Sequence, residues 1–298
     1  MGSTVDDDFI WELRRRMFLG MTDDVGACAP PEEEVSPAPK EDEVVVFSAH
    51  LERGLGLPVS SFFAEFLRFY GLYPHHLGAN CITQLSCFVV LCEAYLGVWP
   101  SMEIFGMFFF LRSQTTAGQQ RDCGGVSISA KNTPLPKINL PDSIKKWQGT
   151  YFYARNLTAV DRIGLPAFSN ELPASKSWLR KPPVDGALEK VLFSRLKVLV
   201  AGGLRSRDLT LTWLSRRMYP LQARPHKLCF YSGIRDPSRT CLELPNQKSL
   251  RKWAARLITD RVEAEWDFGF EPFTRAERAP EVSPCNLVYL RFFRPAAA

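Results

Sequence analysis

The chain has 298 residues, 46% of them hydrophobic, and a formal net charge of +5. This length suits one large domain or two ordinary ones, and the apolar content is that of a globular protein with a buried core. The charge is unevenly divided, because residues 1–50 carry a net charge of −8 and residues 51–298 carry +13. The sequence therefore predicts an acidic tail and a basic body, and a basic body favours polyanionic partners.

The cysteines and the apolar segments exclude a secreted or membrane-spanning protein. Three of the eight cysteines fall in one apolar stretch, which is more typical of a reducing compartment than of a disulfide framework. The first residues are acidic and no secretory signal follows, while Asp6 stands where a myristoylation site prefers Ser or Thr. The most apolar stretch, residues 81–99, contains Gln84 and Glu93 and is better explained as a core helix. We expect an intracellular protein, nuclear or cytoplasmic, without a membrane partner.

Residues 1–43 are predicted to form a disordered acidic tail. The stretch 9–21 could form a short amphipathic helix, but it has little nearby to pack against. The stretch 22–43 is rich in proline and acidic residues and cannot bury enough apolar surface to offset its ordering entropy. The folded body is expected to begin near Val44 and to continue to residue 298.

Residues 44–112 are predicted to form a helical part with three helices. Their expected N-caps are Ser60 or Ser61, Asn80 and Ser101. Glycines end the first two helices, at Gly71 and Gly97. Aromatic and aliphatic residues recur on one face of each helix at the spacing of a buried stripe, and the third helix is apolar on nearly all sides.

Residues 123–157 are predicted to form a small antiparallel sheet. The segments 126–132 and 147–157 alternate between apolar and polar residues, as strands with one buried face do. The basic part, residues 184–265, is helical again, with Asp185 and Ser206 as caps and Pro220 as a stop. The expected fold is therefore α+β and mainly α-helical, with a small central antiparallel sheet and a disordered acidic N-terminal tail.

Catalytic signatures are missing from the sequence. No phosphate loop, nucleophile elbow, zinc-protease motif or aspartic-protease motif occurs, and no CxxC pair is present for a zinc knuckle. The pair His75-His76 most resembles an enzyme site, but we expect surface or capping histidines in a loop between two helices. We expect a structural role for His226 as well. The sequence thus predicts a protein that is not an enzyme, with no cofactor, no metal site and no identified small-molecule substrate.

The strongest signal is a basic segment between Arg205 and Arg256, which carries a net charge of +9 with aromatic residues between its cations. Arginine forks bind phosphates, and aromatic faces stack on unpaired bases. The helices on either side of Gly202-Gly203 are also arranged like a helix-turn-helix. The candidate nucleic-acid-binding residues are Arg205, Arg207, Arg216, Arg217, Arg224, Lys227, Arg235 and Arg239. The alternative is that the aromatics anchor the core and the arginines form a solvated rim, and both interpretations stay open.

Three blocks of the sequence resemble, in the same order, a plant domain family of gypsy-type transposon origin. The first runs from Arg53 to Phe105 and includes "RGLGLP", the Asn at position 80 and "FVVLCEAYLG". The others are "WQGTYFYARN" and "RRMYPLQARPHKLCFYSGIRDPSR", and together the three blocks span about residues 45–260. The resemblance implies descent from a long-terminal-repeat retrotransposon of the type found in grasses. It implies no catalytic residues, and it makes self-association or nucleic-acid packaging natural roles.

The sequence therefore predicts a transposon-derived protein without catalytic activity that binds DNA or RNA or assembles with itself in the manner of a gag protein. The alternative is a protein–protein interaction scaffold whose acidic tail docks on basic partners or folds back on the basic body. Deletion of residues 1–43 separates these hypotheses, because a masking tail predicts tighter nucleic-acid binding once it is removed.

Overall fold

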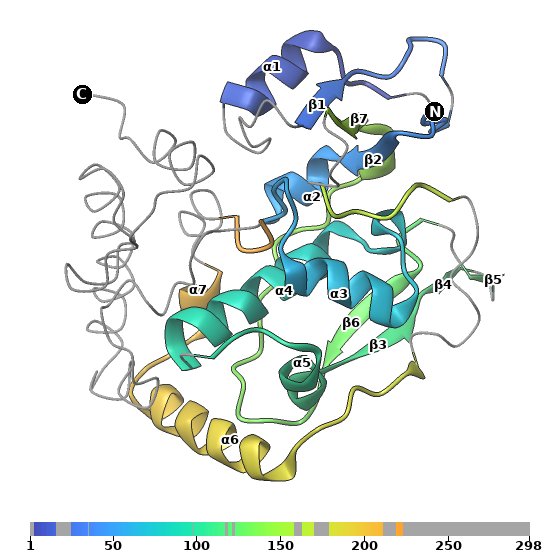
Figure 1. Ribbon diagram of the computed structural model, residues 1–298. Coiled ribbons are helices and arrows are strands. Elements are labelled where there is room, and N and C mark those ends of the chain that lie inside the picture. Colours follow the sequence, from blue (N-terminus) through green and yellow to red (C-terminus); the bar gives the residue numbers. More distant parts are fainter. Residues whose placement is uncertain are drawn as a thin grey trace, which may run out of the picture.

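The computed structural model describes residues 3–15, 25–34, 36–96, 98–116, 119–120, 123–157, 163–169, 179–210 and 219–222. These residues form a mixed α+β structure of helices and small antiparallel sheets (Figure 1). The α+β class is thus confirmed for the described part of the chain. Most of the basic segment, from residue 223 onward, lies outside it.

The N-terminal residues form part of a three-stranded sheet. Strand β7 (Tyr151–Asn156) lies in its centre, antiparallel to β1 (Val25–Cys28) on one side and to β2 (Glu43–Phe47) on the other. Helix α1 (Asp7–Arg15) lies beside β1 at the end of the molecule that carries this sheet (Figure 1). The prediction of a disordered tail over residues 1–43 is therefore not confirmed, because the described residues of this segment contribute α1, β1 and the start of β2. Its local composition is unfavourable, but β7 supplies the pairing partner and the apolar surface that the segment itself lacks.

The helical core follows in chain order from residue 48. Its elements are α2 (Ser48–Glu52), α3 (Ser61–Tyr70), η1 (Pro74–His76), α4 (Ala79–Val90), η2 (Leu91–Leu96) and α5 (Met102–Phe108). The predicted cap of α3 is confirmed, because the Ser60 hydroxyl accepts a hydrogen bond from the Phe63 amide at 3.3 Å. Gly71 ends α3 in the left-handed conformation that glycine adopts without steric cost.

Aromatic rings hold this core together. Phe105 of α5 is fully buried, and its ring lies 5.3 to 6.5 Å from five others, those of Phe62, Phe66, Tyr70, Phe88 and Phe109. Most of these pairs are tilted or edge-to-face, the arrangements that the ring quadrupoles favour. The predicted apolar faces of the three helices thus meet around α5.

Helix α4 differs from its prediction at both ends. Its N-cap is Gly78 rather than Asn80, which lies in the first turn. At its C-terminal end the α-helix changes at Leu91 to the π-helix η2, and the Val98 amide then donates to the Cys92 carbonyl at 2.9 Å. The fully buried Glu93 lies in this wider turn. A π-helical turn inside a helix leaves no mark on 3.6-residue periodicity that a single sequence could reveal.

The predicted sheet over residues 123–157 is divided between two sheets. Strand β6 (Val126–Ala130) pairs with β3 (Phe109–Ser113), whereas β7 pairs with the N-terminal strands. A short hairpin of β4 (Thr115–Thr116) and β5 (Gln119–Gln120) extends beyond β3, and the 3-10 turn η3 (Trp147–Gly149) precedes β7. The strand segments were predicted correctly, but the single central sheet was wrong because the partners of β7 are distant in sequence.

The last described helices are α6 (Gly186–Ala201) and α7 (Ser206–Leu209). The predicted cap of α6 is confirmed, since the Asp185 carboxylate accepts from the Ala187 amide at 2.8 Å. The N-cap position of α7 is Arg205 rather than Ser206. Across the described chain, no helix combines the length and apolar character needed to cross a membrane.

Candidate functional site

The predicted nucleic-acid-binding residues fall mostly outside the described chain. Only Arg205 and Arg207 are described, and both are exposed next to or within α7. The other six predicted residues, Arg216, Arg217, Arg224, Lys227, Arg235 and Arg239, lie outside the described residues, as does His226.

Arg205 is exposed, and its side chain also caps the C-terminal end of α6. Its Nη1 donates to the carbonyl oxygens of Val200 and Leu204, each at 3.0 Å, and so satisfies the C-terminal end of α6. Its backbone amide donates to the buried Asp208 carboxylate at 2.8 Å. Cations near a helix C-terminus interact favourably with the helix dipole. At Arg205, these bonds therefore favour the alternative in which the arginines of the basic segment have a structural role.

The helix-turn-helix arrangement is only partly described. The turn at Gly202-Gly203 is present, but the second helix ends at Leu209, and residues 211–218 lie outside the described chain. The described part of α7 is a single turn, whereas a recognition helix must be long enough to lie in a groove of DNA.

The histidine pair is buried, in contrast to its predicted surface position. His75 and His76 are 6% and 0% exposed, and His50 of α2 is 0% exposed. The capping role is confirmed for His76, whose Nδ1 accepts from the Tyr73 amide at 3.1 Å. Nothing in the sequence pattern indicated that α2 would bring a third histidine, His50, to this pair.

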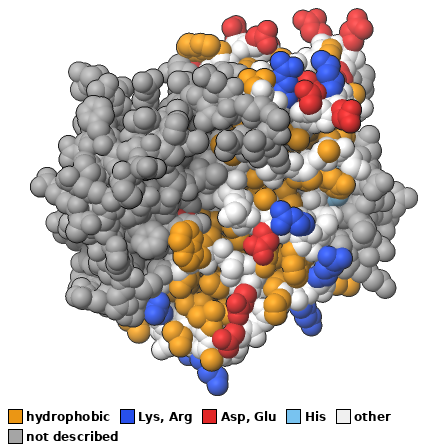
Figure 2. All heavy atoms as spheres, viewed as in Figure 1, with side chains coloured by type: hydrophobic (Ala, Val, Ile, Leu, Met, Phe, Trp, Pro, Cys, Tyr) orange, Lys and Arg blue, Asp and Glu red, His pale blue; other side chains and the backbone are white. Residues whose placement is uncertain are grey.

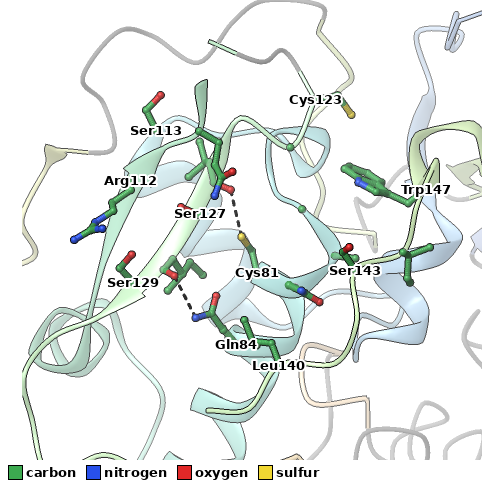
Figure 3. Close-up of a pocket in the computed structure, with 18 of the residues that line it drawn as sticks. Cys81, Gln84, Arg112, Ser113, Cys123, Ser127, Ser129, Leu140, Ser143 and Trp147 are labelled. Carbon is green, nitrogen blue, oxygen red and sulfur yellow. Dashed lines mark hydrogen bonds between the residues drawn. The ribbon is translucent and has the colours of Figure 1, made fainter. Parts of the chain in front are cut away.

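A pocket of about 730 Å³ opens between α4, β6 and the segment 140–148 (Figure 3). One wall is the N-terminal turn of α4, from Gly78 to Cys81, together with Gln84. The second wall is β6 with the end of β3, and the third contains Ser143 and Trp147. The sequence analysis did not find this pocket, because its walls come from three segments that the sequence separates.

Helix α4 covers the outer edge of β6 with two side chains. Cys81 Sγ donates to the Val126 carbonyl at 3.3 Å, and Gln84 Nε2 donates to the Ile128 carbonyl at 3.2 Å (Figure 3). These bonds replace those that a further strand would make, and they fix the distance between the first two walls of the pocket.

The third wall is fastened to the helices by its backbone. Asn80 Nδ2 donates to the Pro141 carbonyl at 3.3 Å, and Arg53 Nη2 donates to the Asp142 carbonyl at 2.8 Å. The Asn139 amide donates to the Ser206 hydroxyl at 2.6 Å. The segment 139–148 has no regular structure before η3, so these side chains hold it in place.

The chemistry of the lining is polar and without negative charge. Among its described lining residues the only ionised side chain is Arg112, which lies on the rim with its guanidinium 5.0 Å from the centre of the Phe110 ring. Four serines also line the pocket, and their hydroxyls make no hydrogen bond to another described residue. They are Ser113, Ser127, Ser129 and Ser143. Oδ1 of Asn80 is buried and has no partner among the described residues. The pocket therefore offers serine hydroxyls that can donate or accept, the amide oxygen of Asn80 as a further acceptor, and a cation.

No metal centre is formed by the described residues, since no group of three or more His, Cys, Asp or Glu side chains is placed to hold an ion. Together, the fold and the pocket define an α+β domain with a polar, anion-compatible pocket beside a buried histidine cluster.

Residues 44–113, from β2 to the end of β3, match the family model described as "Putative gypsy type transposon". The match confirms the resemblance over the first of the three sequence blocks and includes Asn80, Gln84 and Arg112 of the pocket. Neither the curated proteins nor the solved structures contain a match to this chain.

Proposed function

We propose that this transposon-related protein is not an enzyme and that it binds single-stranded nucleic acid. The observation that carries the proposal is the pocket beside α4, which combines Arg112, four serine hydroxyls and Asn80 with no carboxylate among its described lining residues. A phosphate group needs donors and positive charge around it, and a carboxylate in the same place would repel it.

Two lysines beside the pocket add positive charge to its surroundings. Lys145 and Lys146 are exposed and directly precede Trp147 in the third wall of the pocket. The free Oδ1 of Asn80 suits a donor such as a base amino group or a ribose hydroxyl. The basic segment 205–256, with its net charge of +9, supplies a second place for phosphate contacts.

A titration of fluorescently labelled single-stranded DNA and RNA, followed by anisotropy at about 50 and 200 mM salt, tests the proposal. We expect binding that weakens steeply with salt. The triple variant Arg112→Gln, Lys145→Gln, Lys146→Gln should weaken binding at the lower salt by about tenfold or more and reduce the salt slope by about 2, near 0.7 for each lost contact.

The matched control is Lys181→Gln, Lys190→Gln, Lys197→Gln, which removes the same charge from exposed positions in and just before α6. A second set, Arg216→Gln, Arg217→Gln, Arg224→Gln, Arg235→Gln, tests the basic segment. Equal losses in the pocket set and in the α6 control would mean that only overall charge matters. Absence of binding at the lower salt would overturn the proposal.

A second candidate function, self-association, is favoured by the outer face of α6. The leucines at 192, 196 and 199 face the core, yet Val184, Val191 and Val198 are 39%, 51% and 52% exposed. Val191 and Val198 of α6 are seven residues apart and therefore lie along one side of the helix, as in the seam of a coiled coil, while Val184 lies just before the helix begins. Figure 2 shows hydrophobic side chains with charged side chains of both signs between them over the lower part of the molecule, where Figure 1 places α6.

Analytical ultracentrifugation of the full chain separates this candidate from a monomer. We expect a concentration-dependent dimer or larger species that the variant Val191→Glu, Val198→Glu abolishes, while Lys190→Gln, Lys197→Gln on the neighbouring exposed positions changes the net charge by the same −2 and serves as the charge-matched control. A wild-type chain that stays monomeric at high concentration would exclude self-association through this face.

A further inference from the structure

Three of the four histidines of the chain form one buried cluster. His50 comes from α2, and His75 and His76 come from η1. The rings of His75 and His76 lie 4.2 Å apart, and His50 is near enough to disfavour protonation of His75. Histidines are usually at least half exposed, so three buried together need a physical explanation.

The hydrogen bonds of the cluster fit neutral rings. Nε2 of His50 lies 3.0 Å from the Leu77 carbonyl oxygen, to which it donates its proton, so its Nδ1 is bare. Nδ1 of His50 and Nδ1 of His75 are both buried without a partner among the described residues. Nδ1 of His76 is an acceptor for the Tyr73 amide and is likewise unprotonated. Adding a proton to Nδ1 of His50 or of His75 would place a positive charge where no described residue supplies an acceptor.

The surroundings of the cluster are aromatic rather than acidic. His50 packs against Phe47 of β2 and Trp147 of η3, and His75 packs against Tyr73 and against Phe168 of the segment 163–169. Among the described residues, the Tyr73 ring also lies at the cluster, with its centre 5.8 Å from that of His75 and 5.5 Å from that of His76. No carboxylate among the described residues acts on His50 or His75. An imidazolium here would therefore be desolvated and unpaired.

His50 and His75 are each joined to residues that line the pocket. The ring of His50 lies 5.1 Å from that of Trp147, and the carbonyl oxygen of His75 accepts from the Gly124 amide at 2.8 Å. Leu77, which accepts from His50, forms a bridge with Val126 of β6. Trp147, Gly124 and Val126 all line the pocket (Figure 3). Movement of the histidine rings would therefore shift the pocket walls directly.

We propose that the cluster of His50, His75 and His76 is a pH-sensitive latch, which holds the pocket walls in place while its rings are neutral and releases them when a ring takes up a proton. The inference that the latch regulates ligand binding rests on the proposed function. The inference that the cluster changes the conformation of the pocket with pH does not. Two buried histidines with unpartnered Nδ1 atoms, one with its ring against Trp147 and the other bonded through its carbonyl to Gly124, form the bistable element that such a switch requires.

The direction of the pH dependence follows from burial. Burial lowers the pKa of His50 to about 4, and burial together with His76 and His50 lowers the pKa of His75 to about 3. Once the cluster opens to water, each ring regains a pKa of about 6.5. The open form then binds more protons than the closed form between these values, so the closed form loses stability as pH falls from about 6.5 toward 4.

Fluorine NMR of the full chain labelled with 5-fluorotryptophan tests the latch, with the Trp147 resonance assigned from its loss in Trp147→Phe. We expect the Trp147 signal to change environment between about pH 6 and 4. The variant His50→Gln, His75→Phe keeps a donor to the Leu77 carbonyl and a ring against Tyr73, and it should lower the midpoint by about one pH unit or more. His226→Gln, the remaining histidine, is the matched control and should leave the midpoint unchanged.

Equal midpoints in the wild type and in the double variant would overturn the proposal and assign the acid response to other groups. Circular dichroism at pH 7.5 checks that the double variant folds, and if it does not, His75→Phe alone is measured with the same expectation. Single-stranded DNA binding across the same pH range is the second measurement. If the chain binds no nucleic acid, the fluorine signal still decides for or against the latch.

Discussion

Nη1 of Arg195 donates a hydrogen bond to the carbonyl oxygen of Leu96 at 3.0 Å, which joins α6 to the end of the π-helix η2. A π-helical turn and the chain after it leave carbonyl oxygens without their usual helical partners, and a long side chain from a neighbouring helix can satisfy one. The same helix buries Leu192, Leu196 and Leu199, so the Arg195 hydrogen bond adds to the apolar packing of α6 against the core.

Replacement of Arg195 tests this contact. We expect Arg195→Met to lower the free energy of unfolding by about 1–2 kcal/mol, because the carbonyl of the buried Leu96 loses a charged donor while the apolar stem is kept. Urea denaturation followed by circular dichroism measures the change. Lys197→Met, an exposed neighbour on α6, is the control and should stay within about 0.5 kcal/mol of the wild type.

Gly54 is a second position with a clear expectation. Its φ is +109°, and a Cβ built there would lie 2.2 Å from Oγ of Ser86, which itself donates to the Arg53 carbonyl. Gly54→Ala should therefore reduce the free energy of unfolding by about 2 kcal/mol or more. Gly186→Ala, at the start of α6 with open space around it, should be neutral or stabilising in the same denaturation experiment. Equal stability of the two variants would contradict the geometry at Gly54.

Removal of the N-terminal segment should damage the fold. Deletion of residues 1–43 takes away β1 and the buried side chains of Val5, Ile10 and Leu13, and it leaves one edge of β7 without a partner. We expect the thermal unfolding midpoint to fall by about 10 °C or more. A separate, disordered tail would leave the midpoint unchanged. Glu32→Gln, Glu33→Gln changes the charge of an exposed turn and should leave the midpoint near that of the full chain.

The cysteines should divide sharply in their reactivity. Burial raises the pKa of the Cys81 thiol to about 11 and that of Cys87 to about 12, and Cys92 is 0% exposed. Cys28 is exposed, although burial of part of its surface and the neighbouring Glu43 also raise its pKa. With iodoacetamide at pH 8, mass spectrometry should find Cys28 alkylated well before these three. Labelling of all four at one rate would mean that α4 opens readily.

The capping residues and the apolar spacing predicted the helices between residues 60 and 110 well. Ser60, Gly71 and Ser101 act as the sequence indicated, because capping depends on a residue and its immediate neighbours. The same is true of Asp185 at the start of α6. The change from α to π at Leu91 could not be predicted, since the apolar stripe continues across it.

The pocket and the tail were missed for a different reason. Val25 pairs with Asn156, and Asn80 bonds to Pro141, so both depend on contacts between segments far apart in the chain. Periodicity and propensity describe one segment at a time, and tertiary pairing overrides them. The predicted phosphate-binding arginines from 216 to 239 stay a prediction.

The central position of β7 also affects the order in which the protein can fold on the ribosome. Strands β1 and β2 are synthesised first, but their only described strand partner begins at Tyr151. At usual translation rates the N-terminal strands must wait on the order of 10 s for this partner to be made. During that interval the valine-rich β2 has two open edges, so the acidic residues around it, from Glu32 to Asp42, would keep nascent chains apart until the sheet closes.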